Sequence, residues 1–221
     1  MSLKPIAAHR FAVLFVFLLG CLIYFPFAGE HGVPFSVFRV LIAVVILASV
    51  YAVSLRHGVL ILAVALAIPA MVEHTQLLHS YTGVLPLLNF ALSFAFDVFI
   101  VVVMFRRVFT TAKPDAETIF GALCIYLLIG FSFASLYGLV SRLQPGSFYM
   151  NPVTNIRSTP NRFDFVYYSF ATMTCLGATG IAPITDHARS VSIIEALVGL
   201  LYLAVLISRL MSAYQAYHRL P

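Results

Sequence analysis

The segment "FATMTCLGATGIAPITDHARS", Phe170 to Ser190, lies between two long apolar runs and decides how the chain folds. It has too many Gly, Pro and polar residues for an ordinary membrane span, yet it is too apolar for a solvated loop. Its apolar part, about 163–176, is shorter than the roughly 20 residues that a span needs. A segment that enters the membrane without crossing it must be sheltered by protein or line a water-filled cavity. We therefore expect a re-entrant half-helix followed by a loop.

The composition of the whole chain predicts an integral membrane protein embedded in a lipid bilayer. Of its 221 residues, 62% are hydrophobic and 10% are charged, whereas soluble domains carry about 25% charged residues. No hydrophilic stretch is long enough for a soluble domain, which needs at least about 50 residues. The net charge of +5 comes from basic residues scattered near the ends of apolar runs. We therefore expect no nucleic-acid partner.

The apolar runs predict an all-α fold with six transmembrane helices, and the re-entrant segment lies between the fifth and the sixth. The first run follows Lys4 and Arg10, as in a signal peptide, but no small-x-small cleavage site follows it. We therefore expect an uncleaved first helix. The six predicted spans are 11–28, 37–55, 59–72, 85–105, 119–140 and 190–213.

The distribution of basic residues predicts a multi-pass protein of the cell (inner or plasma) membrane with both termini in the cytoplasm. Lys and Arg concentrate at the cytoplasmic ends of membrane helices. With the N-terminus inside, the larger basic group is cytoplasmic, and the smaller group lies outside around the re-entrant segment. The cytoplasmic group is Lys4, Arg10, Arg56, Arg106, Arg107, Lys113, Arg209 and Arg219, and the external group is Arg142, Arg157, Arg162 and Arg189.

The stretch "KPDAE", Lys113 to Glu117, is the clearest internal boundary. Pro114 interrupts a helix, whereas the acidic Asp115 and Glu117 favour the start of the next one. We therefore predict a four-helix transmembrane region over 1–112 and a helix–re-entrant segment–helix unit over 113–221.

A short helix followed by a Thr- and Gly-rich return can direct backbone carbonyls at an ion. Selectivity filters use such carbonyls to replace the hydration shell of the ion, and glycine permits the unusual backbone that this requires. The C-terminal end of the preceding helix carries partial negative charge and favours a cation.

The stretch Phe163 to Leu210 resembles the pore unit of the bacterial potassium channel family, whose pore domain is shared with two-pore-domain potassium channels. The resemblance covers 117–214 and implies a homotetramer that conducts monovalent cations such as K⁺ and needs no cofactor. It rests on Thr172, Thr174, Gly177, Ile181, Pro183 and Thr185, which have the spacing of the family motif. The filter that it implies is Thr174, Cys175, Leu176, Gly177, Ala178, Thr179 and Gly180.

The centre of this filter departs from the family sequence Thr-Val-Gly-Tyr-Gly-Asp. Ala178 stands at the Tyr position, Thr179 at that of the second Gly and Gly180 at that of the Asp. Cys175 stands at the position of the Thr ligand. A β-branched residue resists left-handed backbone by about 1–2 kcal/mol, and a thiol is a weaker ligand than a hydroxyl. We therefore expect poor discrimination between K⁺ and Na⁺.

Three further residues are candidates for supporting the pore. We expect Asp164 to cap the pore helix or to complement the charge of its N-terminus. The resemblance places Glu195 behind the filter, as a hydrogen-bonding brace or a satisfied structural acid. Gly199 is either a hinge in the last helix or a point of close helix packing.

The remaining polar residues give weaker indications. Asp97 lies within the fourth span, either in a functional role or buried in a pair with Arg39. That span contains no arginine, so we expect no voltage sensor. The segment "EHTQLLH", 73–79, lacks recognised metal-ligand spacing, and we expect no metal site.

The sequence shows no catalytic constellation and no inverted repeat, which disfavours a membrane enzyme or a transporter. The alternative to a channel is a non-conducting scaffold or regulatory subunit with the same fold.

Overall fold

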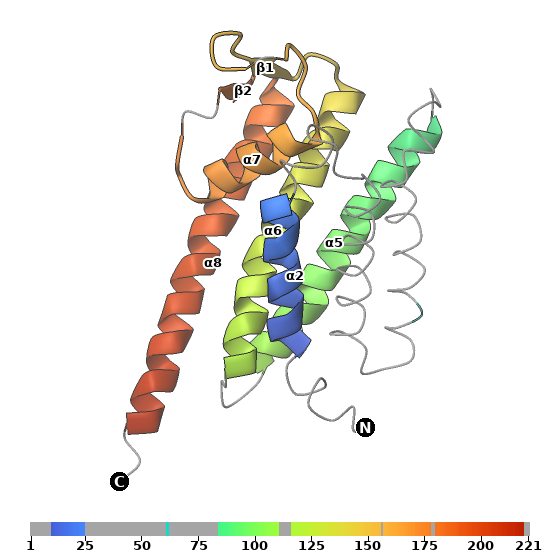
Figure 1. Cartoon of the computed structure of the whole chain (residues 1–221). Coiled ribbons are helices and arrows are strands. Elements are labelled where there is room, and N and C mark those ends of the chain that lie inside the picture. Colours follow the sequence, from blue (N-terminus) through green and yellow to red (C-terminus); the bar gives the residue numbers. More distant parts are fainter. Residues whose placement is uncertain are drawn as a thin grey trace. The chain divides into compact units, whose positions relative to one another are not determined.

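The computed structural model describes residues 10–24, 61, 84–110, 116–155, 157–177 and 180–218 (Figure 1). These residues form mainly helices and divide between two compact units, 1–110 with 116–128 and 111–115 with 129–221. The predicted second span, and all of the third except residue 61, lie outside the described residues. The predicted domain boundary near 113 stays a prediction.

The first unit contains α2 (Arg10–Tyr24), α5 (Val84–Thr110) and the first half of α6 (Ala116–Leu143). One face of α2 is buried, because its buried residues recur every three or four positions. The backbone N–H of Phe11 donates to the carboxylate of Glu117 at 2.9 Å, and the thiol of Cys124 donates to the Phe11 carbonyl at 3.4 Å. These contacts join the start of α2 to α6. The buried α2 residues are Phe11, Leu14, Leu18 and Cys21.

The second unit contains the second half of α6, β1 (Phe148–Met150), α7 (Arg162–Met173), β2 (Ile181–Pro183) and α8 (Asp186–His218). The short helix α7 packs against α8 (Figure 1). The two strands pair antiparallel, with Phe148 opposite Pro183 and Met150 opposite Ile181. The expected all-α class is thus corrected to a mostly helical fold. The reason is that β1, which precedes α7, pairs with β2, which follows the loop after α7.

Among the described residues, two helices are long and apolar enough to cross a membrane. In α6, Glu117–Leu143 has 27 residues and contains an 18-residue window with a mean hydropathy of 2.2. In α8, Asp186–Met211 has 26 residues and contains such a window with a mean hydropathy of 2.3. Both exceed the roughly 20 residues that a span requires. The last helix is longer than the predicted 190–213, because it starts four residues earlier and continues to His218. These two helices are candidate membrane spans.

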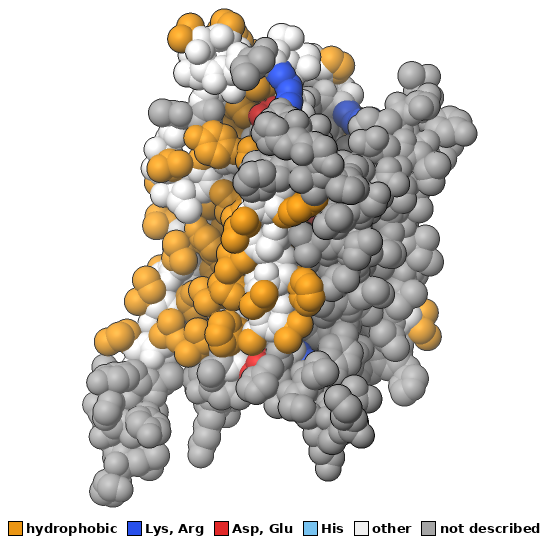
Figure 2. All heavy atoms as spheres, in the orientation of Figure 1, with side chains coloured by type: hydrophobic (Ala, Val, Ile, Leu, Met, Phe, Trp, Pro, Cys, Tyr) orange, Lys and Arg blue, Asp and Glu red, His pale blue; other side chains and the backbone are white. Residues whose placement is uncertain are grey.

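Much of the apolar surface of α8 is exposed in a single chain. Figure 2 shows hydrophobic side chains along this helix. A helix that exposes large apolar side chains over most of its length needs either lipid or protein around it. The exposed residues are Ile193, Ile194, Leu197, Leu200, Leu201, Val205, Ile207 and Met211.

An aromatic cluster, formed by Tyr137, Phe148, Phe165 and Tyr168, joins α6, β1 and α7. The ring of Tyr137 lies 5.0 Å from that of Tyr168 and 5.5 Å from that of Phe148, both in edge-on contact. Phe148 and Phe165 are 5.1 Å apart. Such pairs add about 0.5–1.5 kcal/mol beyond the area that they bury. The cluster therefore fixes the first half of α7 against α6.

A glycine allows α6 and α7 to approach closely near the end of α7. A Cβ atom on Gly130 would lie only 2.7 Å from the ring of Phe170, and that ring also packs edge-on against Phe131 at 5.5 Å. The missing side chain at position 130 thus makes room for the Phe170 ring.

We predict that Gly130→Ala destabilises the protein by about 1–3 kcal/mol, the usual effect of overpacking. The added methyl group must displace the Phe170 ring. Thermal unfolding in detergent measures the effect, and Phe170→Leu in the same chain should restore part of the loss because it frees the space. Equal stability of Gly130→Ala and the unmodified protein would contradict this packing.

Candidate functional site

A capping box starts α7. Asn161 is the N-cap residue, and its side chain accepts a hydrogen bond from the backbone N–H of Asp164 at 2.9 Å. The carboxylate of Asp164 in turn accepts from the backbone N–H of Asn161 at 2.7 Å. Asp164 is therefore the third helical residue and not the N-cap residue. It completes the capping box that Asn161 begins, and as an acid in the first turn it also complements the charge of the helix N-terminus, the other role expected of it.

A tight backbone turn ends α7. The N–H of Cys175 donates to the carbonyl of Thr172 at 3.2 Å, and the N–H of Leu176 donates to that of Ala171 at 2.9 Å. This pair of bonds defines a Schellman motif, in which the residue after the cap adopts left-handed backbone and is usually glycine. Here that residue is Cys175, with a φ of 55°. The chain therefore turns through Cys175 before the loop continues.

The loop after α7 is exposed in a single chain from Thr174 to Gly177. The side chain of Leu176 is 67% exposed, although leucine is usually buried. The hydroxyl of Thr174 donates to the carbonyl of Phe170 at 2.7 Å, so it is directed back at the helix. Gly177 has a φ of 66°, which glycine adopts without strain. Ala178 and Thr179 lie outside the described residues, so strain at Thr179 stays a prediction.

The three cysteines differ in exposure. Cys21 and Cys124 are buried, in agreement with a packing role, whereas Cys175 is exposed on the loop. A reagent in solution would therefore reach Cys175 and not the other two.

A buried polar cluster, formed by Tyr137, Ser169 and Glu195, joins α6, α7 and α8. Glu195 has no exposed surface. One of its carboxyl oxygens is hydrogen bonded to the hydroxyl of Tyr137 and the other to the hydroxyl of Ser169. Ser169 also donates to the carbonyl of Gly130 at 2.7 Å. The candidate support residue Glu195 therefore contacts both α6 and α7.

The number of hydrogen-bond protons in this cluster restricts the kind of side chain that position 195 can hold. There are three hydrogen bonds, but the hydroxyls of Tyr137 and Ser169 supply one proton each. The third proton must come from the side chain at position 195, which then donates to the Ser169 hydroxyl. Otherwise Ser169 has to share its single proton between the Gly130 carbonyl and the carboxyl group. A side chain that accepts at one end and donates at the other therefore satisfies all three bonds.

Gly199 lies where α8 meets the end of α7. A Cβ atom there would be 3.2 Å from the Cα atom of Met173. The contact is with backbone, which has little freedom to move away. Of the two readings of Gly199, this geometry favours close packing.

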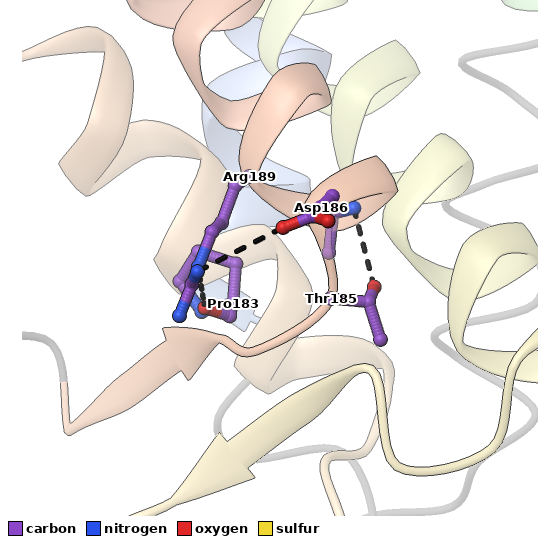
Figure 3. Close-up of polar contacts among 5 residues, drawn as sticks. Pro183, Thr185, Asp186 and Arg189 are labelled. Carbon is purple, nitrogen blue, oxygen red and sulfur yellow. Dashed lines mark hydrogen bonds and ion pairs between the residues drawn. The ribbon is translucent and has the colours of Figure 1, made fainter.

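The segment from β2 into α8 is held by its own polar contacts (Figure 3). The guanidinium Nε of Arg189 donates to the carbonyl of Pro183 at 3.3 Å, and Nη1 lies 3.9 Å from the carboxylate of Asp186. The hydroxyl of Thr185 accepts from the N–H of Ala188 at 3.4 Å and caps the helix. These bonds fix the point where the chain leaves the loop and enters α8.

The geometry is a short helix between two long apolar helices, with an exposed loop at its C-terminal end. Residues 121–216 match the family model described as "Ion channel". The match supports an ion channel domain over these residues. The match includes the candidate loop, Glu195 and Gly199. A comparison with curated proteins finds no match.

The sequence did not indicate several residues that shape this matched region. Asn161 was missed, although Asn-x-x-Asp before an apolar helix is a recognisable capping pattern. Tyr137 and Ser169 lie 58 and 26 positions from Glu195, and only the fold shows that they meet. Asp97 lies in α5, but Arg39, its predicted partner, lies outside the described residues, so the pair stays a prediction.

We predict that Glu195→Gln retains the stability of the protein, whereas Glu195→Ala lowers it by about 1–3 kcal/mol. Glutamine accepts from Tyr137 and donates to Ser169, whereas alanine breaks two interhelical bonds, each of which contributes about 0.6–1.7 kcal/mol in membranes. Thermal unfolding of both variants in the same detergent checks this. A glutamine variant as unstable as the alanine variant would show that the cluster needs a charged carboxylate.

Proposed function

We propose that the chain is a subunit of a cation channel that resembles potassium channels, with a pore formed by four copies. The observation that carries the proposal is the loop of Thr174–Gly177, which a single chain leaves exposed at the end of a firmly packed helix within an ion channel domain. One such loop cannot surround an ion. Symmetric copies around one axis supply the remaining ligands.

The exposed apolar residues of α8 support the same assembly. In a tetramer, part of this surface contacts neighbouring copies, part lines the pore and the rest contacts lipid. The helix that precedes the pore helix, α6, is more buried within the chain and has less surface to offer. We assign the inner position to α8 and the outer position to α6.

We further propose six crossings, with both termini in the cytoplasm and with residues 1–112 outside the pore. The basic residues follow this orientation. The helix that holds Asp97, α5, carries Arg106 and Arg107 only at its C-terminal end. A voltage sensor needs basic residues within the span, so the conductance should depend little on voltage.

The permeant ions are monovalent cations, and we propose that K⁺ and Na⁺ are separated poorly. The support is the filter sequence, in which Ala178 and Thr179 replace Tyr and Gly of the family motif. Fewer ordered carbonyls leave the ion more hydrated, and hydrated ions are harder to distinguish. The same departure is what favours the alternative, a non-conducting scaffold or regulatory subunit.

We predict that a cationic methanethiosulfonate reagent blocks most of the current of the purified protein in liposomes. Cys175 is the exposed cysteine of the loop, and a bulky cation attached there would obstruct the ion path. Cys175→Ser should conduct and resist the reagent, because Cys21 and Cys124 are buried. A protein that is labelled at Cys175 but carries no current before labelling would be the scaffold; a current unaffected by complete labelling would place the ion path elsewhere.

We predict that the double change Ala178→Tyr and Thr179→Gly raises the ratio of K⁺ to Na⁺ permeability by about tenfold, the factor that corresponds to 1–2 kcal/mol of backbone strain. Reversal potentials under bi-ionic conditions measure this ratio. Thr179→Val is the matched control, since it keeps the β-branched shape, and it should leave the ratio unchanged. Strong K⁺ preference in the unmodified protein would contradict the proposal.

A further inference from the structure

The carbonyl oxygen of Gly180, at the outer end of the loop, is held by the external segment 151–155. It accepts two hydrogen bonds, one from the backbone N–H of Asn151 and one from the side-chain amide of Asn155, both at 2.9 Å. A carbonyl oxygen has two lone pairs, so both are used. This oxygen therefore faces the external segment and is not a ligand for a passing ion.

The side chain of Asn155 also closes the external segment on itself. Its amide nitrogen lies 3.0 Å from the carbonyl of Asn151 and 3.2 Å from the hydroxyl of Thr154. The side-chain oxygen of Asn151 accepts from the N–H of Val153 at 2.9 Å, which is an Asx turn. The segment is thus ordered by its own hydrogen bonds and presents the amide of Asn155 to Gly180.

The pairing of β1 with β2 brings the external segment 151–155 next to Gly180. Residue 151 directly follows β1, and Gly180 directly precedes β2. Since Met150 is opposite Ile181 in the sheet, the bond from Asn151 to Gly180 continues the ladder beyond the last pair. Asn155 adds a side-chain bond to the same carbonyl.

Gly180 has no room for a side chain. Its φ is 72°, and a Cβ atom there would lie 2.5 Å from the hydroxyl oxygen of Thr154 and 2.8 Å from the amide nitrogen of Asn155. Only glycine suits both this backbone and this contact. The external segment therefore packs directly against the backbone of Gly180 at the end of the loop.

We propose that Asn155 is a positioning residue that anchors the outer end of the pore loop and thereby sets its ion selectivity. Asn155 does not touch an ion. It acts through Gly180, which follows the two substituted filter positions Ala178 and Thr179 directly. The part that concerns selectivity rests on the proposed channel function, whereas the anchoring itself does not.

Two measurements on the full-length protein test this inference with three variants. Asn155→Ala removes the donor, and Asn155→Asp replaces it with an acceptor that faces the Gly180 oxygen. Val153→Ala is the matched control, because the Val153 side chain is 89% exposed in the same segment. Hydrogen exchange in detergent follows the amide of Asn151, and bi-ionic reversal potentials follow the K⁺ to Na⁺ permeability ratio.

Both Asn155 variants should speed exchange at Asn151 and change the permeability ratio by about fivefold, the factor that one net hydrogen bond corresponds to. Val153→Ala should change neither. Unchanged exchange in Asn155→Ala would overturn the anchor, and faster exchange with an unchanged ratio would overturn its role in selectivity. If the unmodified protein carries no current, the channel proposal fails, and the exchange result alone decides whether Asn155 anchors the loop.

Discussion

The packing of the candidate pore domain depends on the hydrogen bonds of the Glu195 carboxyl group. The group is fully buried, and it is hydrogen bonded to one hydroxyl on α6 and to another on α7. A polar group buried in an apolar environment without partners costs several kcal/mol. Both oxygens of this carboxyl group have partners only when α6, α7 and α8 are packed together. This requirement restricts how α7 can lie between α6 and α8. The aromatic cluster around Tyr137 and the close contact at Gly199 reinforce the same arrangement.

The backbone of α7 is subject to a related constraint. A helix that stops within a membrane leaves unpaired N–H groups at one end and carbonyls at the other. The capping box of Asn161 and Asp164 serves the first end. The Schellman turn through Cys175 serves the other, and it does so with a non-glycine residue in left-handed backbone. The helix is thereby finished at both ends before the loop begins.

The sequence predicted the long helices and a short helix between the last two of them, because run length and composition determine them; that the short segment is re-entrant stays a prediction. Hydropathy located 119–140 and 190–213, and the structure extends both into α6 and α8. The small sheet was not predicted, since three-residue strands leave almost no pattern. Asp164 lies in the first turn of α7, as expected, but the N-cap residue is Asn161.

The site was predicted less completely than the fold. Spacing picked out Thr174 and Gly177, and the resemblance added Cys175 and Gly180 to the implied filter. The match over 121–216 supports the domain that contains them, and the filter itself stays a prediction. The partners of these residues depend on contacts between distant segments. Nothing local marks Ser169 as a partner of Glu195 or Asn155 as a partner of Gly180. Such pairs follow from the register of β1 with β2 and from the way in which α7 packs.

One loop per chain makes a pore only when copies of the chain assemble around an axis, and the mass of the assembly in lipid nanodiscs tests this most directly. The chain has a mass of 24.3 kDa. Native mass spectrometry should give about four times this value, and the assembly should dissociate when large polar residues replace the exposed apolar side chains of α8. A stable monomer in a bilayer would contradict the account.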